Sequence, residues 1–209
     1  MERLAESCKV IRLKLALFGG TFDPIHNAHL TVAREAATQF SIERVLFVPA
    51  AHPPHKTDSL GASYQDRLAM VSLACQVDPR FEASRLEDGS GPSYSIDTVE
   101  KVRGQAEQLF FIIGADAFTE ITTWHRWRDL LASTDFIVVT RPGHLEYPCP
   151  EGARVHRLDT LALPVSSSDI RQQLMEGRRP EALPPAVAEY ILARGLYQCA
   201  GAATPSAAQ

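Results

Sequence analysis

Short apolar runs alternate with longer amphipathic runs along most of the chain. The first apolar run, residues 13–17 with leucine at every second position, predicts a strand, and residues 30–40 behind it predict a helix. The same alternation predicts further strands at 44–49, 81–87, 109–113, 136–140 and 155–158, and further helices at 63–77, 95–107, around 124–131, 168–176 and 185–194. Because the connections are short, we expect an α/β fold in which helices cover both faces of a mostly parallel sheet.

The two ends of the chain do not continue this pattern. We expect residues 1–12 to be an N-terminal extension, 13–198 a single domain and 199–209 a flexible tail of small and polar residues. No apolar run has the length of a membrane span, and the N-terminus lacks the apolar centre of a signal peptide. The four cysteines form no Cys-x-x-Cys pair, which favours free thiols in a reducing compartment. The expectation is a cytoplasmic protein without membrane contact.

The charge balance limits the classes of partner. A formal net charge of −4 argues against the broad basic surface that nucleic-acid binding requires, so no nucleic-acid partner is expected. A local pocket for a small anionic substrate is compatible with that balance. Two segments of the chain carry the residues for such a pocket.

The first segment, residues 19–29, reads Gly-Gly-Thr-Phe-Asp-Pro-Ile-His-Asn-Ala-His and joins the first strand to the first helix. Gly19 and Gly20 lack a Cβ, so the backbone there can approach a ligand closely and adopt a positive φ. His26 and His29 are three residues apart, which in a first helical turn places both rings on one side, beside free backbone N–H groups. Imidazoles and a helix N-terminus together make a donor-rich, partly positive site that suits a polyphosphate.

The second segment, residues 166–171, reads Ser-Ser-Ser-Asp-Ile-Arg at the start of a predicted helix. Hydroxyl groups at a helix start either cap free N–H groups or hold phosphate oxygens. Arg171 lies one turn into the helix, where its guanidinium could bind a phosphate through two N–H groups. Taken alone, a plain serine cap with a surface arginine is the favoured interpretation. The presence of the first segment strengthens the phosphate interpretation.

Further clusters follow the other predicted strands. His55 and Lys56 lie in a proline-stiffened loop that either contacts a phosphate or is simply solvated. Residues 91–98 form a turn before a helix, whose free N–H groups could hold a carboxylate. Asp116 follows a strand end, where ligands gather in sheets of this type. Trp124, like the tryptophan three residues later, fits the apolar face of a helix, but one of the two could stack on a flat ring.

Other ligand chemistries fit the paired histidines less well. A histidine pair at this spacing could form half of a metal site, but no matching Cys or His pair has zinc spacing, and we assign no metal ligand. The Gly-Lys-Ser/Thr ending of a P-loop and the Gly-x-Gly-x-x-Gly of a dinucleotide-binding turn are both absent.

Together the two segments resemble the signatures of a known superfamily. Residues 19–30 are similar to the first signature of the nucleotidyltransferases with paired histidines, His-x-Gly-His, except that Ala28 replaces the glycine. Residues 166–171 are similar to the second signature. The intervening segments resemble the bacterial nicotinate-mononucleotide adenylyltransferases at residues 53–56, 91–98, 114–116, 124 and 141–143. The resemblance extends from about residue 13 to residue 197 and implies a Rossmann-like, doubly wound α/β fold.

The resemblance implies that the adenylyl group of ATP is transferred to nicotinate mononucleotide, giving nicotinate adenine dinucleotide (deamido-NAD) and pyrophosphate in NAD biosynthesis. ATP and the mononucleotide would be the small-molecule substrates, Mg²⁺ would be carried by the ATP phosphates, and the protein would be a monomer or a homodimer. By the same resemblance, the catalytic residues would be His26, His29 and Arg171. These three would bind ATP together with Gly19, Gly20, Thr21, Phe22, Ser167 and Ser168.

On the acceptor side, the resemblance implies that the nicotinate ring stacks on Trp124 and that its carboxylate accepts backbone N–H groups of Ser95 and His125. His125 stands where relatives often carry an aromatic ring such as tyrosine. The other implied substrate-binding residues are His55, Lys56, Asp116 and Arg141. Activity is expected to persist with Ala28, whose methyl group lies toward the face where adenosine would bind.

Three rival functions stay open at this point. A related adenylyltransferase could act on nicotinamide mononucleotide or phosphopantetheine, although Trp124 and the turn at Ser95 favour a pyridine ring with an acid group. A non-catalytic nucleotide sensor is the rival from another class, and the intact pair of histidines argues against it. A metalloprotein ranks last.

Overall fold

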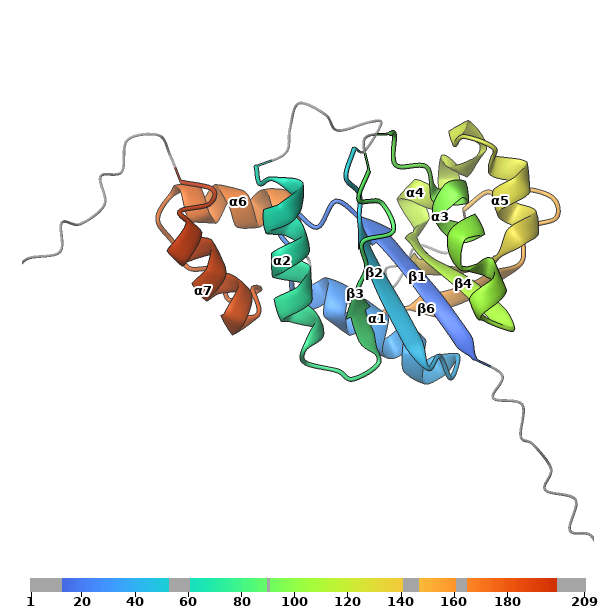
Figure 1. The fold of residues 1–209 in the computed structure, drawn as a ribbon, viewed down its shortest axis with the longest axis horizontal. Coiled ribbons are helices and arrows are strands. Elements are labelled where there is room, and N and C mark those ends of the chain that lie inside the picture. The colour runs from blue at the N-terminus through green and yellow to red at the C-terminus, as the bar shows by residue number, and fades with distance from the viewer. Residues whose placement is uncertain (1–12, 53–60, 90, 141–146, 161–164, 199–209) are drawn as a thin grey trace, which may run out of the picture.

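The structure, a computed structural model, describes residues 13–52, 61–89, 91–140, 147–160 and 165–198. Within these ranges the chain forms one sheet flanked by helices (Figure 1). The elements in chain order are β1 (Lys14–Gly20), α1 (Asn27–Gln39), β2 (Arg44–Pro49), α2 (Tyr64–Cys75), β3 (Phe81–Ala83), α3 (Ser95–Val102), the 3₁₀-helix η1 (Arg103–Gln105), β4 (Gln108–Gly114), α4 (Ala115–Thr119), the 3₁₀-helix η2 (Ile121–Thr123), α5 (Trp127–Ser133), β5 (Asp135–Thr140), β6 (Val155–Asp159), α6 (Ser167–Met175) and α7 (Pro185–Arg194).

The strands of the sheet are all parallel and lie in the order β3-β2-β1-β4-β5-β6. The chain builds outward from β1 to β3, crosses back, and adds β4 on the other side of β1. The connections therefore diverge between β1 and β4, which is where sheets of this kind bind ligands at the carboxyl ends of the strands. The predicted Rossmann-like, doubly wound α/β fold is confirmed.

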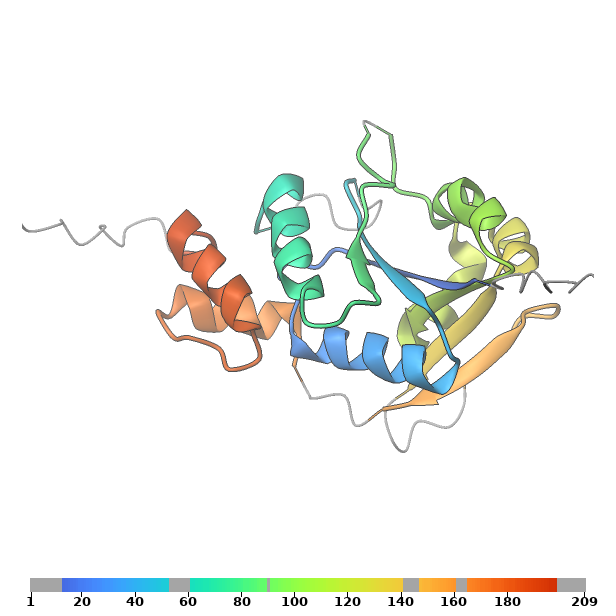
Figure 2. The ribbon, with the colours of Figure 1, turned by 60° about the horizontal axis from the view of Figure 1, so that its bottom comes forward.

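Helices cover both faces of the sheet, as predicted (Figures 1 and 2). Side chains alternate along β1, because successive residues of a strand point to opposite faces. Leu15 and Leu17 belong to the apolar core shared with α3, α4 and α5. Ala16 belongs to the core on the other face, which is shared with α1, α2, α6 and α7. The last two helices lie at one end of the molecule, where α7 packs beside α2 (Figure 2).

Two predicted elements are shorter in the structure. The strand predicted over 81–87 ends at Ala83, because β3 is an edge strand that pairs only with the middle of β2. The helix predicted over 95–107 ends at Val102 and continues as η1, which contains Gly104. Glycine is a poor helix former, which accounts for the change of helix type.

Candidate active site

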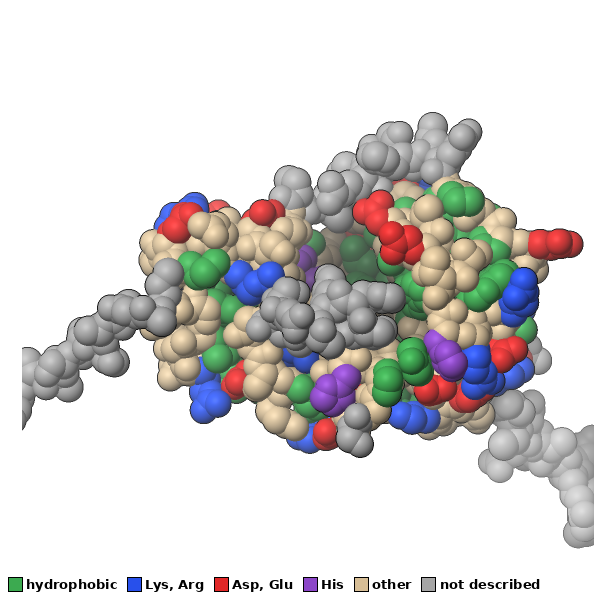
Figure 3. Space-filling view, turned by 90° about the horizontal axis from the view of Figure 1, so that it is seen from above, with side chains coloured by type: hydrophobic (Ala, Val, Ile, Leu, Met, Phe, Trp, Pro, Cys, Tyr) green, Lys and Arg blue, Asp and Glu red, His purple; other side chains and the backbone are tan. Residues whose placement is uncertain are grey.

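The two predicted phosphate-binding segments line one cleft at the carboxyl end of β1. The cleft has a volume of about 580 Å³. One wall is the loop from β1 to α1 with the first turn of α1, and it includes Thr21, His26 and His29; the other is the start of α6, with Ser167 and Arg171. The face shown in Figure 3 is hollowed near its middle, with histidine atoms at the wall of the hollow. Groups from distant parts of the sequence thus face a common space.

The glycines of the first segment line the cleft but lack the positive φ that was predicted for them. Gly19 and Gly20 are the last residues of β1, still in register with β2, and neither has a positive φ. The left-handed residue is Phe22, with a φ of 49°. A Cβ on Gly20 would lie 3.1 Å from the Phe22 ring. Gly20 therefore makes room for Phe22, which is buried and meets His29 edge-on at a centroid distance of 5.1 Å.

The paired histidines stack at the start of α1. The helix begins at Asn27, three residues before its predicted start, so His26 is the N-cap and His29 the third helical residue. Their ring centroids are 3.8 Å apart, with 27° between the planes. The backbone N–H of His26 donates to Nδ1 of His29 at 3.3 Å. With Nδ1 as an acceptor, neutral His29 carries its proton on Nε2, which is then its donor.

Both imidazoles are neutral at pH 7 in this structure. Burial lowers the pKa of His26 to about 4. Burial, and after it the neighbouring His26, lower the pKa of His29 well below its usual value. The expectation that the imidazoles add positive charge is therefore wrong: positive potential comes from the N-terminus of α1 and from Arg171. Nδ1 of His26 is buried and has no hydrogen-bond partner among the described residues.

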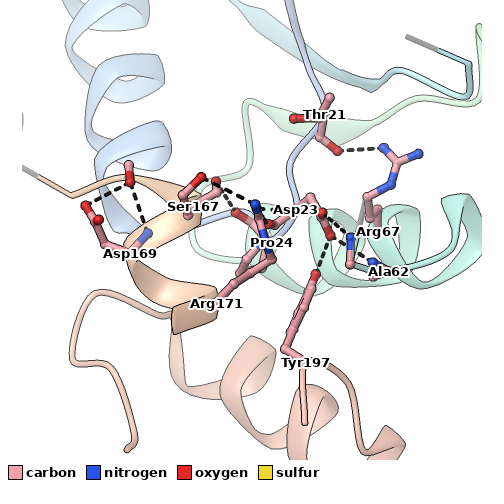
Figure 4. Close-up of polar contacts among 12 residues, drawn as sticks. Thr21, Asp23, Pro24, Ala62, Arg67, Ser167, Asp169, Arg171 and Tyr197 are labelled. Carbon is pink, nitrogen blue, oxygen red and sulfur yellow. Dashed lines mark hydrogen bonds and ion pairs between the residues drawn. The ribbon is translucent and has the colours of Figure 1, made fainter. Parts of the chain in front are cut away.

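The first turn of α6 is bonded directly to the loop between β1 and α1. Oγ of Ser167 donates to the Pro24 carbonyl at 3.0 Å, and Nη1 of Arg171 donates to the Asp23 carbonyl at 2.7 Å (Figure 4). Nη2 of Arg171 donates to Oγ of Ser168 at 3.3 Å. The predicted phosphate ligands are therefore held in place by the opposite wall of the cleft.

The serine run contains the predicted helix cap and also lines the cleft. Ser166 is the N-cap of α6, and its Oγ accepts the backbone N–H of Asp169 at 3.1 Å. The serine cap therefore exists, but it uses the first serine only. The next two serines and Arg171 line the cleft.

The chain matches one family model and curated proteins that share a name. Residues 17–173 match the cytidylyltransferase-like family. A Solibacter usitatus protein named probable nicotinate-nucleotide adenylyltransferase is 56% identical over 188 residues, which cover 88% of this chain and all of that protein. A Moorella thermoacetica protein of the same name is 43% identical, covering 88% of this chain and 92% of its own.

The chain belongs to the nicotinate-nucleotide adenylyltransferase family.

Solved structures agree with this assignment at the level of the fold. Plasmodium falciparum nicotinic acid mononucleotide adenylyltransferase complexed with NaAD matches with a TM-score of 0.73 at 20% identity, covering 88% of this chain and 97% of the other. The same enzyme complexed with APC matches with a TM-score of 0.71.

Of the predicted acceptor residues of this adenylyltransferase family member, the four that the structure describes, Ser95, Asp116, Trp124 and His125, lie outside the lining of the cleft described above. Trp124 follows η2 and precedes α5, so it is not in a helix as predicted, and it meets Phe111 of β4 edge-on at 6.4 Å. Asp116 is exposed in the first turn of α4.

Ser95 and His125, the two predicted backbone donors, are brought into one neighbourhood by an aromatic contact. Ser95 is the first residue of α3, and Tyr94 is its N-cap. The His125 ring stacks on Tyr94 at a centroid distance of 4.2 Å. The contact therefore links the turn before α3 to the segment after Trp124. Three other predicted substrate residues, His55, Lys56 and Arg141, lie outside the described residues.

Sequence reasoning missed two buried residues that support the cleft. Arg67 of α2 is fully buried, and its guanidinium donates to the Thr21 carbonyl at 2.6 Å (Figure 4). It also donates to the Ala50 carbonyl at 2.8 Å. It thereby joins the chain beyond β1 to the chain beyond β2. Tyr197, beyond α7, donates its hydroxyl to the Asp23 carboxylate. The position of Arg67 among the apolar residues of α2 could have indicated a buried, hydrogen-bonded arginine. No sequence pattern indicates that Tyr197 pairs with Asp23.

Two further findings concern ligands of other kinds. In the parts of the chain that the structure describes, no group of three or more His, Cys, Asp or Glu side chains could hold a metal ion. Of the helices found there, none is both long enough and apolar enough to cross a membrane.

Proposed function

We propose that this chain transfers the adenylyl group of ATP to nicotinate mononucleotide, forming nicotinate adenine dinucleotide and pyrophosphate as a step of NAD biosynthesis. The observation that carries the proposal is the cleft in which the stacked histidines of α1 face Ser167 and Arg171 of α6. That arrangement would put the two imidazole donors on one side of a bound triphosphate and the guanidinium of Arg171 on the other. Membership of the nicotinate-nucleotide adenylyltransferase family supports the choice of acceptor.

The reaction needs alignment and charge neutralisation rather than a general base. An oxygen of the mononucleotide 5′-phosphate is already anionic, and it attacks the α-phosphorus of ATP. The new phosphorus–oxygen bond forms in line with the bond between the α-phosphorus and the oxygen that bridges to the β-phosphate. That second bond breaks, and the bridging oxygen leaves as part of pyrophosphate. Negative charge grows on that leaving group, so donors fixed in advance at this position lower the barrier.

The residues of the cleft divide this work. His29 would donate to the bridge between the α- and β-phosphates, and His26 to neighbouring phosphate oxygens. Ser167 and Arg171 would hold the β- and γ-phosphates, with Ser168 beside them. Gly19, Gly20, Thr21 and Phe22 would contact ATP, largely through the backbone.

The cleft suits a Mg²⁺ ion that enters bound to the phosphates of ATP. Asp23 is the only carboxylate among the described residues that line the cleft, and its oxygens already accept hydrogen bonds from the protein. Phosphate oxygens would therefore be the main ligands of the ion, which prefers oxygen donors and retains several waters. When bound, Mg²⁺ would neutralise part of the phosphate charge.

On the acceptor side, the nicotinate ring would stack on Trp124, and the backbone N–H groups of Ser95 and His125 would donate to its carboxylate. A carboxylate accepts both donors, whereas an amide presents its own NH₂ group to one of them. His55 and Lys56 would lie near the phosphates, Asp116 near the ribose hydroxyls, and Arg141 beside the substrate.

A side-by-side assay tests the reaction and the acceptor together. Pyrophosphate release from ATP and Mg²⁺ is measured with nicotinate mononucleotide, nicotinamide mononucleotide or phosphopantetheine, with product identity checked by mass. We expect nicotinate mononucleotide to give the highest kcat/KM, by at least about tenfold, because the amide loses one hydrogen bond and leaves a donor unpaired. Preference for either other acceptor would reassign the substrate. ATP binding without turnover on any acceptor would favour a sensor. Size-exclusion chromatography with light scattering distinguishes a monomer from a homodimer.

A further inference from the structure

The Asp23 carboxylate is an unusual feature of a cleft proposed to bind a triphosphate. Its side chain is buried in the wall, with the residue only 2% exposed. One oxygen accepts the Tyr197 hydroxyl at 2.7 Å and the Ala62 N–H at 3.1 Å, and the other accepts the Gly61 N–H at 2.7 Å (Figure 4). Three neutral donors therefore share the charge of this carboxylate.

Arg171 lies close to the same carboxylate without a hydrogen bond to it. Its Nη1 is 3.7 Å from Oδ2 of Asp23 and donates instead to the Asp23 backbone carbonyl. A guanidinium has five N–H groups. Two of them have hydrogen-bond acceptors among the described residues, the Asp23 carbonyl and Oγ of Ser168. An arginine bonded to the carboxylate through two N–H groups would have fewer donors for phosphate.

The fold holds Tyr197 at this carboxylate in three ways. Its φ is 61°, a left-handed conformation that is unfavourable for a residue with a Cβ and persists only where the surroundings impose it. The residue is 8% exposed. A Cβ on Gly61 would lie 2.7 Å from the Tyr197 ring and 3.0 Å from Cδ of Arg171, so only glycine leaves room for both side chains. Burial raises the pKa of the Tyr197 hydroxyl, which therefore stays a donor throughout the working range of pH.

We propose that Tyr197 and Asp23 are positioning residues that keep Arg171 available to the triphosphate of ATP. The inference rests on the proposed adenylyl transfer. Tyr197, Gly61 and Ala62 satisfy the carboxylate, so it does not draw the guanidinium onto itself. The carboxylate in turn keeps Arg171 near the cleft through charge attraction. The segment beyond α7 thereby serves the ATP side of the site, although Tyr197 is 174 residues from Asp23.

The chain contains a matched control for this contact. Tyr190 of α7 also donates its hydroxyl to a buried carboxylate, that of Asp66 in α2, at 2.9 Å. Neither residue lines the cleft. Tyr190→Phe and Tyr197→Phe thus remove the same chemical group from neighbouring parts of the fold, and only the second removes it from a carboxylate that lines the cleft.

The first experiment measures ATP binding by calorimetry and, separately, KM for ATP and for nicotinate mononucleotide. For Tyr197→Phe we expect ATP affinity to weaken and KM for ATP to rise about tenfold, with KM for the mononucleotide changed by less than about twofold. For Tyr190→Phe we expect both KM values to stay within about twofold of the wild type. Equal effects of the two substitutions, or no effect of Tyr197→Phe on ATP, would overturn the proposal.

A double-mutant cycle separates positioning from simple support of the fold. If Tyr197 acts through Arg171, Tyr197→Phe in the Arg171→Ala background should change ATP affinity by less than about twofold. The same cycle with Asp23→Asn is a second measurement, and its effect on ATP should also largely disappear without Arg171. Undiminished effects in the Arg171→Ala background would refute the inference. If the wild type binds ATP but makes no dinucleotide, the proposed function is wrong. The double-mutant cycle measured by ATP affinity still decides whether Tyr197 acts through Arg171.

Discussion

The ATP side and the acceptor side of the proposed site are built in different ways. On the ATP side, hydrogen bonds join residues far apart in the chain, such as Arg171 to Asp23 across 148 positions. In the wall, buried His26 stacks on half-buried His29. On the acceptor side, His125 is exposed and is held by stacking on Tyr94. Charge moves on the ATP phosphates during reaction, so donors there must be fixed in advance. The acceptor ring only has to bind in the right orientation and leave again.

Loss of a fixed donor on the ATP side should have the largest effect. For His29→Ala we expect kcat to fall about 100- to 1,000-fold, as is typical when one preorganised donor to a developing charge is removed. Steady-state kinetics with saturating substrates provide the measurement. His156→Ala, which changes a histidine on β6 bonded to Asp135, serves as the control and should keep kcat within about twofold. Near-normal turnover of His29→Ala would contradict the view that the ATP side depends on donors fixed in advance, and with it the contrast between the two sides.

The ATP side was also the easier half to predict from the sequence. The residues proposed to bind ATP lie in two short contiguous segments, 19–29 and 166–171, and each segment could be found by its local pattern. The strand–helix alternation predicted the parallel sheet with helices on both faces. The supporting contacts could not be found in this way. That Tyr197 donates to Asp23 depends on how α7 docks against α2, and a local pattern carries no information about such pairing.

Burial is the second property that the sequence did not reveal. The spacing of His26 and His29 predicted adjacent rings, and the structure has them stacked. Their neutral state follows from the depth of the N-terminus of α1 in the fold, so it emerged only from the packing. On the acceptor side, too, the sequence did not reveal the packing. His125 could be named as a candidate from its place after Trp124, but its stacking on Tyr94 could not be predicted.

Burial of the histidines gives the ATP side a pH dependence. The folded-state pKa of His26 is lowered from 6.5 to about 4, so the unfolded chain binds more protons between these values. Stability is therefore full above pH 6.5 and is lost as pH falls through this window. We expect the free energy of unfolding to drop by about 2 kcal/mol from this residue between pH 7 and pH 5.

Urea unfolding at the two pH values measures this loss directly. His26→Asn is the comparison variant, because asparagine is a good N-cap residue and does not titrate. The wild type should lose about 2 kcal/mol more than this variant on moving to pH 5. Equal losses in both proteins would show that His26 is not held neutral by burial.

On the acceptor side, the expected effect of a single substitution is on binding. For Trp124→Ala we expect KM for nicotinate mononucleotide to rise about tenfold, since stacking of a base on an aromatic side chain is worth about 1–3 kcal/mol. KM for ATP should stay within about twofold. Trp127→Ala, at the start of α5, is the matched control, because that ring lies against Arg128 at 4.3 Å and should leave both KM values nearly unchanged. An unchanged KM for the mononucleotide in Trp124→Ala would exclude ring stacking there.

The smallest expected effect concerns Ala28, the position that departs from His-x-Gly-His. Ala28 is buried in the first turn of α1, beside both histidines. For Ala28→Gly we expect a loss of up to about 1 kcal/mol in helix stability, with KM for ATP changed by less than about threefold. Ala36 is a buried alanine farther along α1, so Ala36→Gly measures the loss of helix stability alone. It should leave KM for ATP unaltered. If Ala28→Gly lowered KM for ATP by much more than threefold, the alanine methyl would be restricting the bound nucleotide, and the ATP side would be less completely preorganised than its hydrogen bonds indicate.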